Sequence, residues 1–126
     1  MKAQSSKKSE QTLLHYEVID QKPEAPWLVF VHGAGGSIST WKFQVEALAP
    51  HYRLLLVDLR DHGESKGIMP EFPAYDFDIV ATDILAVIDF LGIQKAHFIS
   101  LSIGSVILQK IDIERPELVD RMVMAG

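Results

Sequence analysis

Ser102 lies at a junction where a serine hydroxyl could act as a nucleophile. The run before it, Ala96–Ser100, is strand-like, and the run after it, from Ile103 to about Glu114, is helix-like. The residues two positions before and two positions after the serine are small, Ser100 and Gly104. This spacing is typical of a nucleophile elbow, a sharp turn that holds a serine hydroxyl out at the end of a sheet. The alternative is that Ser102 only caps the helix that follows it.

A glycine-rich loop, His32-Gly33-Ala34-Gly35-Gly36, directly follows the apolar run Trp27–Val31. Because glycines let a backbone come close to a ligand, we expect the backbone N–H groups of Ala34 and Ile103 to form an oxyanion hole. The residues expected to support this loop are His32, Gly33 and Gly35. The alternative is a plain tight turn. A dinucleotide fingerprint is excluded because position 38 is Ile38 rather than glycine, and no Gly-Lys-Ser/Thr run of a phosphate loop is present.

A nucleophilic serine needs a base, and the base needs a partner that orients it. His32 and His62 follow strand-like runs, at the ends where sites form in α/β sheets. We expect His32 to support the glycine-rich loop and His62 to hydrogen-bond within its own loop, rather than either acting as the base. The chain has no cysteine and no metal-ligand spacing such as H-E-x-x-H, so we predict no metal and no cofactor.

Strands and helices alternate along the chain. The expected strands are Leu13–Ile19, Trp27–Val31, Tyr52–Val57, Ala96–Ser100 and Arg121–Ala125, and the expected helices are Trp41–Ala49, Phe77–Leu91 and Ile103 to about Glu114. Asp76 is a good N-cap for the longest helix, which Gly92 closes. This order, with short connections, predicts a three-layer αβα fold, with a mostly parallel sheet and helices on both faces. We expect Trp41 and Phe43 to pack the first helix on the sheet; lining an acyl pocket is their alternative role.

Composition limits the partners and the location of the chain. Its 126 residues carry 12 basic and 17 acidic side chains, a net charge of −5, which predicts no binding to nucleic acid or to a membrane surface. Residues 1–11 form a polar tail without a following apolar stretch, so we expect neither a signal peptide nor a membrane anchor, and a cytoplasmic location. Residues 12–126 then form one domain at most.

The motifs together resemble those of the α/β-hydrolase family, in its branch of small bacterial esterase-like and lactonase-like enzymes. The glycine-rich loop, the run Asp58-Leu59-Arg60-Asp61-His62-Gly63-Glu64-Ser65 and the Ser102 elbow match the segments after the family's third, fourth and fifth strands. The stretch Pro116–Gly126 resembles the family's sixth strand and its approach. Ser100 replaces the usual first glycine of the elbow. Asp61 stands where the family often has glycine, and aspartate tolerates a left-handed backbone better than most residues.

The resemblance implies the N-terminal half of an α/β-hydrolase fold that ends at strand six. It implies a serine hydrolase that acts on a small carboxylic ester, thioester or lactone through an acyl-enzyme on Ser102. In the family the acid and the histidine follow later strands, so we expect this chain alone to be inactive or very weak. The alternative is a non-catalytic half-fold that acts by association. An unpaired edge at Met122-Val123-Met124 favours self-association or binding of a complementing C-terminal half.

Overall fold

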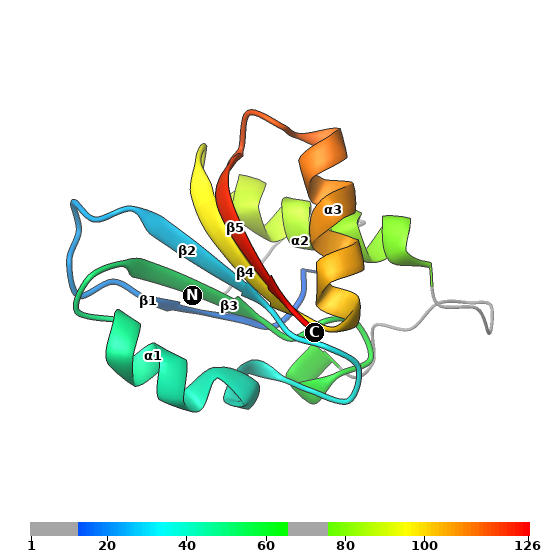
Figure 1. Ribbon diagram of the computed structural model, residues 1–126, viewed down its shortest axis with the longest axis horizontal. Helices are drawn as coiled ribbons and strands as arrows, with labels where there is room; N and C mark the ends of the chain where they lie inside the picture. The colour runs from blue at the N-terminus through cyan, green and yellow to red at the C-terminus, as the bar shows by residue number, and fades with distance from the viewer. Residues whose placement is uncertain (1–12, 66–75) are drawn as a thin grey trace.

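The computed structural model describes residues 13–65 and 76–126, which form a sheet covered by helices on both faces (Figure 1). In this part of the chain the sheet has five strands in the order β1-β3-β2-β4-β5. The strands are β1 (Tyr16–Ile19), β2 (Trp27–Val31), β3 (Arg53–Val57), β4 (Ala96–Leu101) and β5 (Val119–Ala125). Only β1, at one edge, is antiparallel to its neighbour. The predicted mostly parallel sheet is therefore confirmed, and the strand predicted from Leu13 is shorter than expected.

The alternation of side chains along β2 explains why both faces of the sheet are covered. Leu28 and Phe30 point to one face and pack with the segment Ile38–Ala49. Val29 and Val31 point to the other face and pack with α2 (Phe77–Leu91) and α3 (Ile103–Glu114). Figure 1 shows α1 (Lys42–Leu48) on one side of the sheet and α2 and α3 on the other. This confirms the three-layer αβα fold.

Two of the three helices in the described residues have the predicted bounds. The helices are α1 (Lys42–Leu48), α2 (Phe77–Leu91) and α3 (Ile103–Glu114), and short 3₁₀ turns cover Ile38–Trp41 and Gly63–Ser65. Asp76 caps α2 as expected, by accepting hydrogen bonds from two backbone N–H groups of the first turn, and Gly92 ends the helix. The start of α1 differs from the prediction, because Ser37 caps the 3₁₀ turn and α1 begins only after it.

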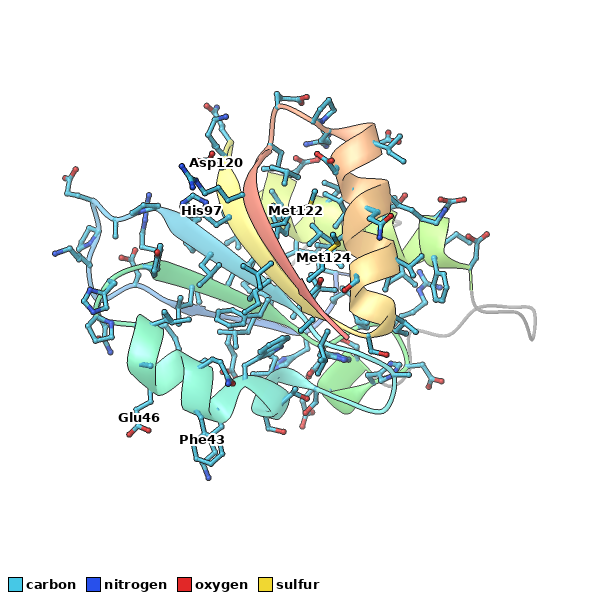
Figure 2. The ribbon with its side chains drawn as sticks, viewed as in Figure 1. Phe43, Glu46, His97, Asp120, Met122 and Met124 are labelled. Atoms are coloured by element: carbon cyan, nitrogen blue, oxygen red, sulfur yellow. The ribbon has the colours of Figure 1, made fainter. Side chains whose placement is uncertain are left out.

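The expectation that both Trp41 and Phe43 pack on the sheet is wrong for Phe43. The Trp41 side chain is 6% exposed, and its ring centroid lies 5.0 Å from that of Phe30 in β2. Phe43 is 72% exposed and points away from the sheet (Figure 2). Residues two apart in a helical segment face in different directions, so only one of the two rings can reach the sheet.

The predicted polar tail 1–11 lies outside the described residues. Within residues 13–65 and 76–126, no helix has the length and apolar character needed to cross a membrane.

Candidate active site

Ser102 occupies a sharp turn between β4 and α3. Its φ of 58° and ψ of −123° are those of the first central residue of a type II′ turn, a place that glycine usually takes. The Ser102 N–H donates to the carbonyl of Ala125 at 2.8 Å, and its carbonyl accepts from the Ser105 N–H at 2.9 Å. The side chain is exposed and makes no capping hydrogen bond to α3. Ser102 is thus at a strained turn, and the alternative that its side chain caps the helix is wrong.

The glycine-rich loop lies directly against this turn. A Cβ atom on Gly33 would be 2.9 Å from the carbonyl oxygen of Leu101 and 3.0 Å from the Cβ of Ser102. A Cβ on Gly104 would be 2.5 Å from the carbonyl oxygen of Val31, at the end of β2. Real Cβ atoms do not come this close, so only glycine fits at both positions. The structure therefore brings together the two predicted motifs, which lie about 70 residues apart in the sequence.

The two expected oxyanion donors have free N–H groups. Ala34 follows Gly33 and is exposed, and Ile103 is the first residue of α3 and half-buried. Among residues 13–65 and 76–126, neither N–H group donates a hydrogen bond. Gly35, one of the expected supporting residues, has a positive φ of 79° at the outer end of the loop. Free N–H groups beside a helix N-terminus favour an anionic oxygen there.

His32 is fully buried, and both of its ring nitrogens bind backbone groups. Nε2 accepts a hydrogen bond from the Leu59 N–H at 3.1 Å, which leaves the proton on Nδ1, and Nδ1 donates to the Gly33 carbonyl at 2.7 Å. Burial lowers the pKa of His32 below its ordinary value of 6.5. The ring is therefore held neutral, in one tautomer, between two loops. Its nitrogens are not available to Ser102, in agreement with the supporting position expected for it.

The other histidines do not bind Ser102, whose hydroxyl has no hydrogen-bond partner among the described residues. The Nδ1 atom of His62 lies 2.9 Å from the Arg60 carbonyl, and its ring centroid is 5.1 Å from that of His32. His62 thus hydrogen-bonds within its own loop, as expected. Asp61 in the same loop has a φ of 65°, so aspartate does take the left-handed conformation here.

Asp58 was a candidate for a contact with a loop histidine or for a loop ion pair, and in the structure it binds backbone N–H groups of two loops instead. It follows β3 directly, is 2% exposed, and accepts from the N–H of Ile38 at 2.7 Å and from the N–H of Glu64 at 2.9 Å. Its own carbonyl accepts from the Ser65 hydroxyl at 2.7 Å. A carboxylate directly after a buried strand was the available signal. Asp58 and His32 together join the glycine-rich loop and its continuation to the loop after β3.

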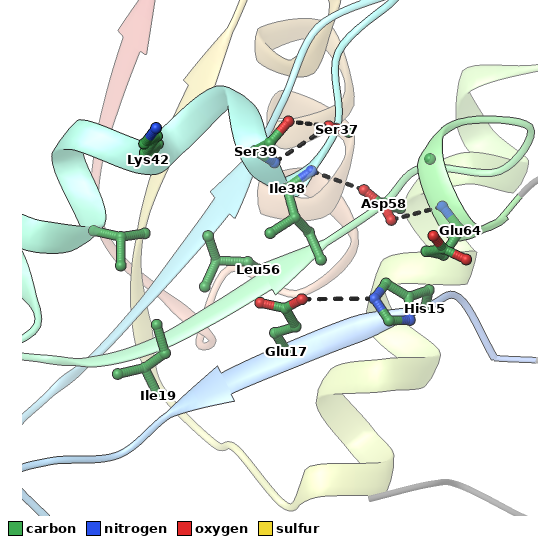
Figure 3. Close-up of a pocket in the computed structure, with 12 residues that line it drawn as sticks. His15, Glu17, Ile19, Ser37, Ile38, Ser39, Lys42, Leu56, Asp58 and Glu64 are labelled. Atoms are coloured by element: carbon green, nitrogen blue, oxygen red, sulfur yellow. Dashed lines mark hydrogen bonds and ion pairs between the residues drawn. The ribbon is translucent and has the colours of Figure 1, made fainter.

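A groove of about 530 Å³ lies between β1, β3 and the start of α1 (Figure 3). Its lining includes the apolar Ile19 and Leu56 and the charged Glu17, Lys42 and Glu64. Ser102 and the two expected oxyanion donors do not line it. The groove therefore lies apart from the candidate nucleophile. In the described part of the chain, no three His, Asp or Glu side chains are placed to hold a metal ion.

Comparison with solved structures finds a similar fold in two longer proteins. A hydrolase from Pseudomonas aeruginosa is 32% identical, with a TM-score of 0.78 over 86% of this chain and 40% of its own. The enol-lactonase from Burkholderia xenovorans is 33% identical, with a TM-score of 0.78 over 86% of this chain and 41% of its own.

Sequence comparison also finds relatives that are longer than this chain. A protein from Agrobacterium fabrum named "Putative carbamate hydrolase RutD" is 33% identical over 112 residues, which are 88% of this chain and 42% of that protein. The chain thus spans about two fifths of the length of the relatives that it matches. The family model described as the alpha/beta hydrolase fold matches residues 26–126. With its sheet order, its elbow and this match in agreement, the chain belongs to the alpha/beta hydrolase fold family.

Proposed function

We propose that Ser102 is the nucleophile of a hydrolase that acts on a carboxylic ester, thioester or lactone. One observation carries the proposal: the Ser102 hydroxyl is exposed at a strained turn and is not used to cap the helix behind it. Strained backbone conformations in folded proteins cluster at functional sites. A serine needed only for structure would sit more favourably at a relaxed helix N-cap.

The proposed reaction passes through an acyl-enzyme. Ser102 Oγ bonds to the substrate carbonyl carbon, and its proton goes through a base to the leaving alkoxide or thiolate as the carbon–leaving-group bond breaks. Water then cleaves the new ester, which releases the acid and restores the hydroxyl. The negative charge on the carbonyl oxygen is stabilised by the N–H groups of Ala34 and Ile103, aided by the dipole of α3.

The base and its acid partner would come from outside these 126 residues. His32 is tied to two backbone groups, and no described residue hydrogen-bonds the Ser102 hydroxyl. The relatives are more than twice as long as this chain, so they contain ample further sequence for these residues. The substrate class is supported by relatives whose names specify an enol-lactonase and an esterase or lipase.

Labelling with a fluorophosphonate tests this proposal, because the probe reacts with activated serine hydroxyls. It would be applied to this chain and to the chain extended to the length of its relatives. We expect strong labelling of the extended protein, weak or no labelling of the 126 residues, and loss of the label in Ser102→Ala. Ser39→Ala, which removes an exposed serine hydroxyl, should label like the parent protein. Labelling that persists in Ser102→Ala, or that never occurs in either protein, would refute the proposal.

Association is a second candidate function, favoured by the exposure of β5. This strand lies at an edge of the described sheet, and Met122, Val123 and Met124 are 37%, 59% and 46% exposed. Met122 and Met124 point to the side of α3, and His97 and Asp120 lie at the beginning of the two neighbouring strands (Figure 2). An unpaired edge with apolar side chains invites pairing with another strand. We propose that β5 binds a second copy or a complementing C-terminal half. Size-exclusion chromatography that shows a stable monomer at all concentrations would contradict the second-copy form.

A further inference from the structure

Two serine hydroxyls are hydrogen-bonded to each other across the turn that holds Ser102. The Oγ atoms of Ser100 and Ser105 lie 2.9 Å apart. Ser100 is fully buried near the end of β4, and Ser105 is half-buried in the first turn of α3. The hydrogen bond therefore joins the strand before the turn to the helix after it. Nothing in the proposed reaction uses either hydroxyl.

The backbone around Ser102 needs such support. Residues other than glycine rarely adopt its conformation, and they keep it only where the surroundings leave no alternative. The backbone N–H of Ser102 is held by Ala125, and its carbonyl is held by the N–H of Ser105. The same Ser105 therefore binds the turn twice, through its N–H to Ser102 and through its hydroxyl to Ser100. Among the described residues, this pair is the side-chain hydrogen bond that joins α3 to β4, and the remaining contacts between the two elements are apolar packing and the turn itself.

A purely local role is the alternative reading of this pair. A buried hydroxyl needs a hydrogen-bond partner, and the two serines could simply satisfy one another. The placement of the pair favours a role in holding the turn. Ser100 lies two residues before Ser102 in β4, and Ser105 lies three residues after it in α3, so each serine belongs to one of the two elements that the turn connects. Small residues at 100 and 105 would fill the space without making this connection.

We propose that Ser100 and Ser105 are positioning residues for Ser102, whose hydrogen bond holds the turn at its positive φ and keeps the nucleophile hydroxyl directed outward. This inference rests on the proposed function for its biological meaning, but its physical content concerns the backbone of Ser102. It can therefore be tested without catalysis.

The test compares glycine with alanine at position 102, in the parent chain and in a Ser100→Ala background. If the turn is held under strain, Ser102→Gly unfolds at a higher urea concentration than Ser102→Ala, because glycine accepts a positive φ. Removing the Ser100 hydroxyl lets the turn relax. We expect the advantage of glycine over alanine to shrink by at least half in the Ser100→Ala background, and likewise with Ser105→Ala. Ser39→Ala is the matched control, since it removes an exposed hydroxyl that lies 2.8 Å from the Ser37 hydroxyl.

The proposal would be overturned if Ser102→Gly keeps its full stability advantage over Ser102→Ala in both the Ser100→Ala and the Ser105→Ala backgrounds. This holds even if Ser100→Ala and Ser105→Ala themselves unfold at lower urea concentrations. That outcome would mean that the hydrogen bond between Ser100 and Ser105 stabilises the fold without holding the Ser102 turn. A smaller advantage in Ser100→Ala and Ser105→Ala, with no change in Ser39→Ala, supports it. Failure of the proposed function appears elsewhere, as absence of fluorophosphonate labelling at Ser102, and leaves these unfolding midpoints unaffected.

Discussion

Replacing Ser102 with glycine should stabilise the protein while it removes the proposed nucleophile. The reason is the backbone conformation of Ser102, with φ of 58° and ψ of −123°. A non-glycine residue held in such a conformation costs about 1–3 kcal/mol. Alanine at the same position keeps this cost and loses the hydroxyl, so Ser102→Ala is the proper reference for Ser102→Gly.

The magnitude follows from two opposing effects. Glycine at position 102 recovers the strain of about 1–3 kcal/mol. It also gives the unfolded chain more freedom, which costs roughly 0.5–1 kcal/mol relative to alanine. We therefore expect Ser102→Gly to be more stable than Ser102→Ala by about 0.5–2 kcal/mol. The hydroxyl makes no hydrogen bond among the described residues, so its removal changes little by itself.

Urea unfolding monitored by tryptophan fluorescence measures this difference, by linear extrapolation to water. The matched control is Gln109, an exposed residue within α3 with no special backbone conformation. There, glycine should be less stable than alanine, by about 1 kcal/mol. Opposite signs at the two positions would establish that Ser102 is held under strain. A Ser102→Gly variant that is no more stable than Ser102→Ala, with the expected result at Gln109, would refute the reasoning.

Three further predictions concern the residues around the turn. Gly104→Ala places a Cβ atom 2.5 Å from the Val31 carbonyl oxygen. Urea unfolding should therefore show a free energy of unfolding lower by about 1–3 kcal/mol. An unchanged free energy of unfolding would mean that α3 can shift away from β2 without cost. Burial lowers the pKa of His32, so its ring takes up a proton less readily in the folded protein than in the unfolded chain. The free energy of unfolding should be full above about pH 6.5 and fall as the pH drops through the lowered pKa. His32→Gln should reduce this dependence of the free energy of unfolding on pH. Asp58→Asn turns an amide NH₂ toward one of the two N–H groups that the carboxylate now binds. The substitution should lower the free energy of unfolding by about 1–3 kcal/mol and speed hydrogen exchange at the Ile38 or Glu64 N–H. Slow exchange at both N–H groups would contradict the bridging role of Asp58.

Much of the fold could be predicted from local sequence. The bounds of α2 follow from its apolar positions, which repeat every three to four residues, and from Asp76 and Gly92 at its ends. The buried strand Trp27–Val31 was visible as a continuous apolar run. Local reasoning was wrong for Phe43, because the direction of a side chain depends on where the helix lies against the sheet, which spacing alone does not specify.

Part of the candidate site could likewise be predicted from the sequence, and part of it could not. Ser102 and the glycine-rich loop were recognisable from residue type and spacing, because a sharp turn and a close backbone approach require small residues at definite positions. Only the tertiary structure showed that Gly33 touches the turn, that the Ser102 hydroxyl does not cap α3, and that Asp58 and His32 join the two loops. These contacts connect residues 20 to about 70 positions apart, and the order of strands in a parallel sheet, rather than any local preference, decides which of them meet.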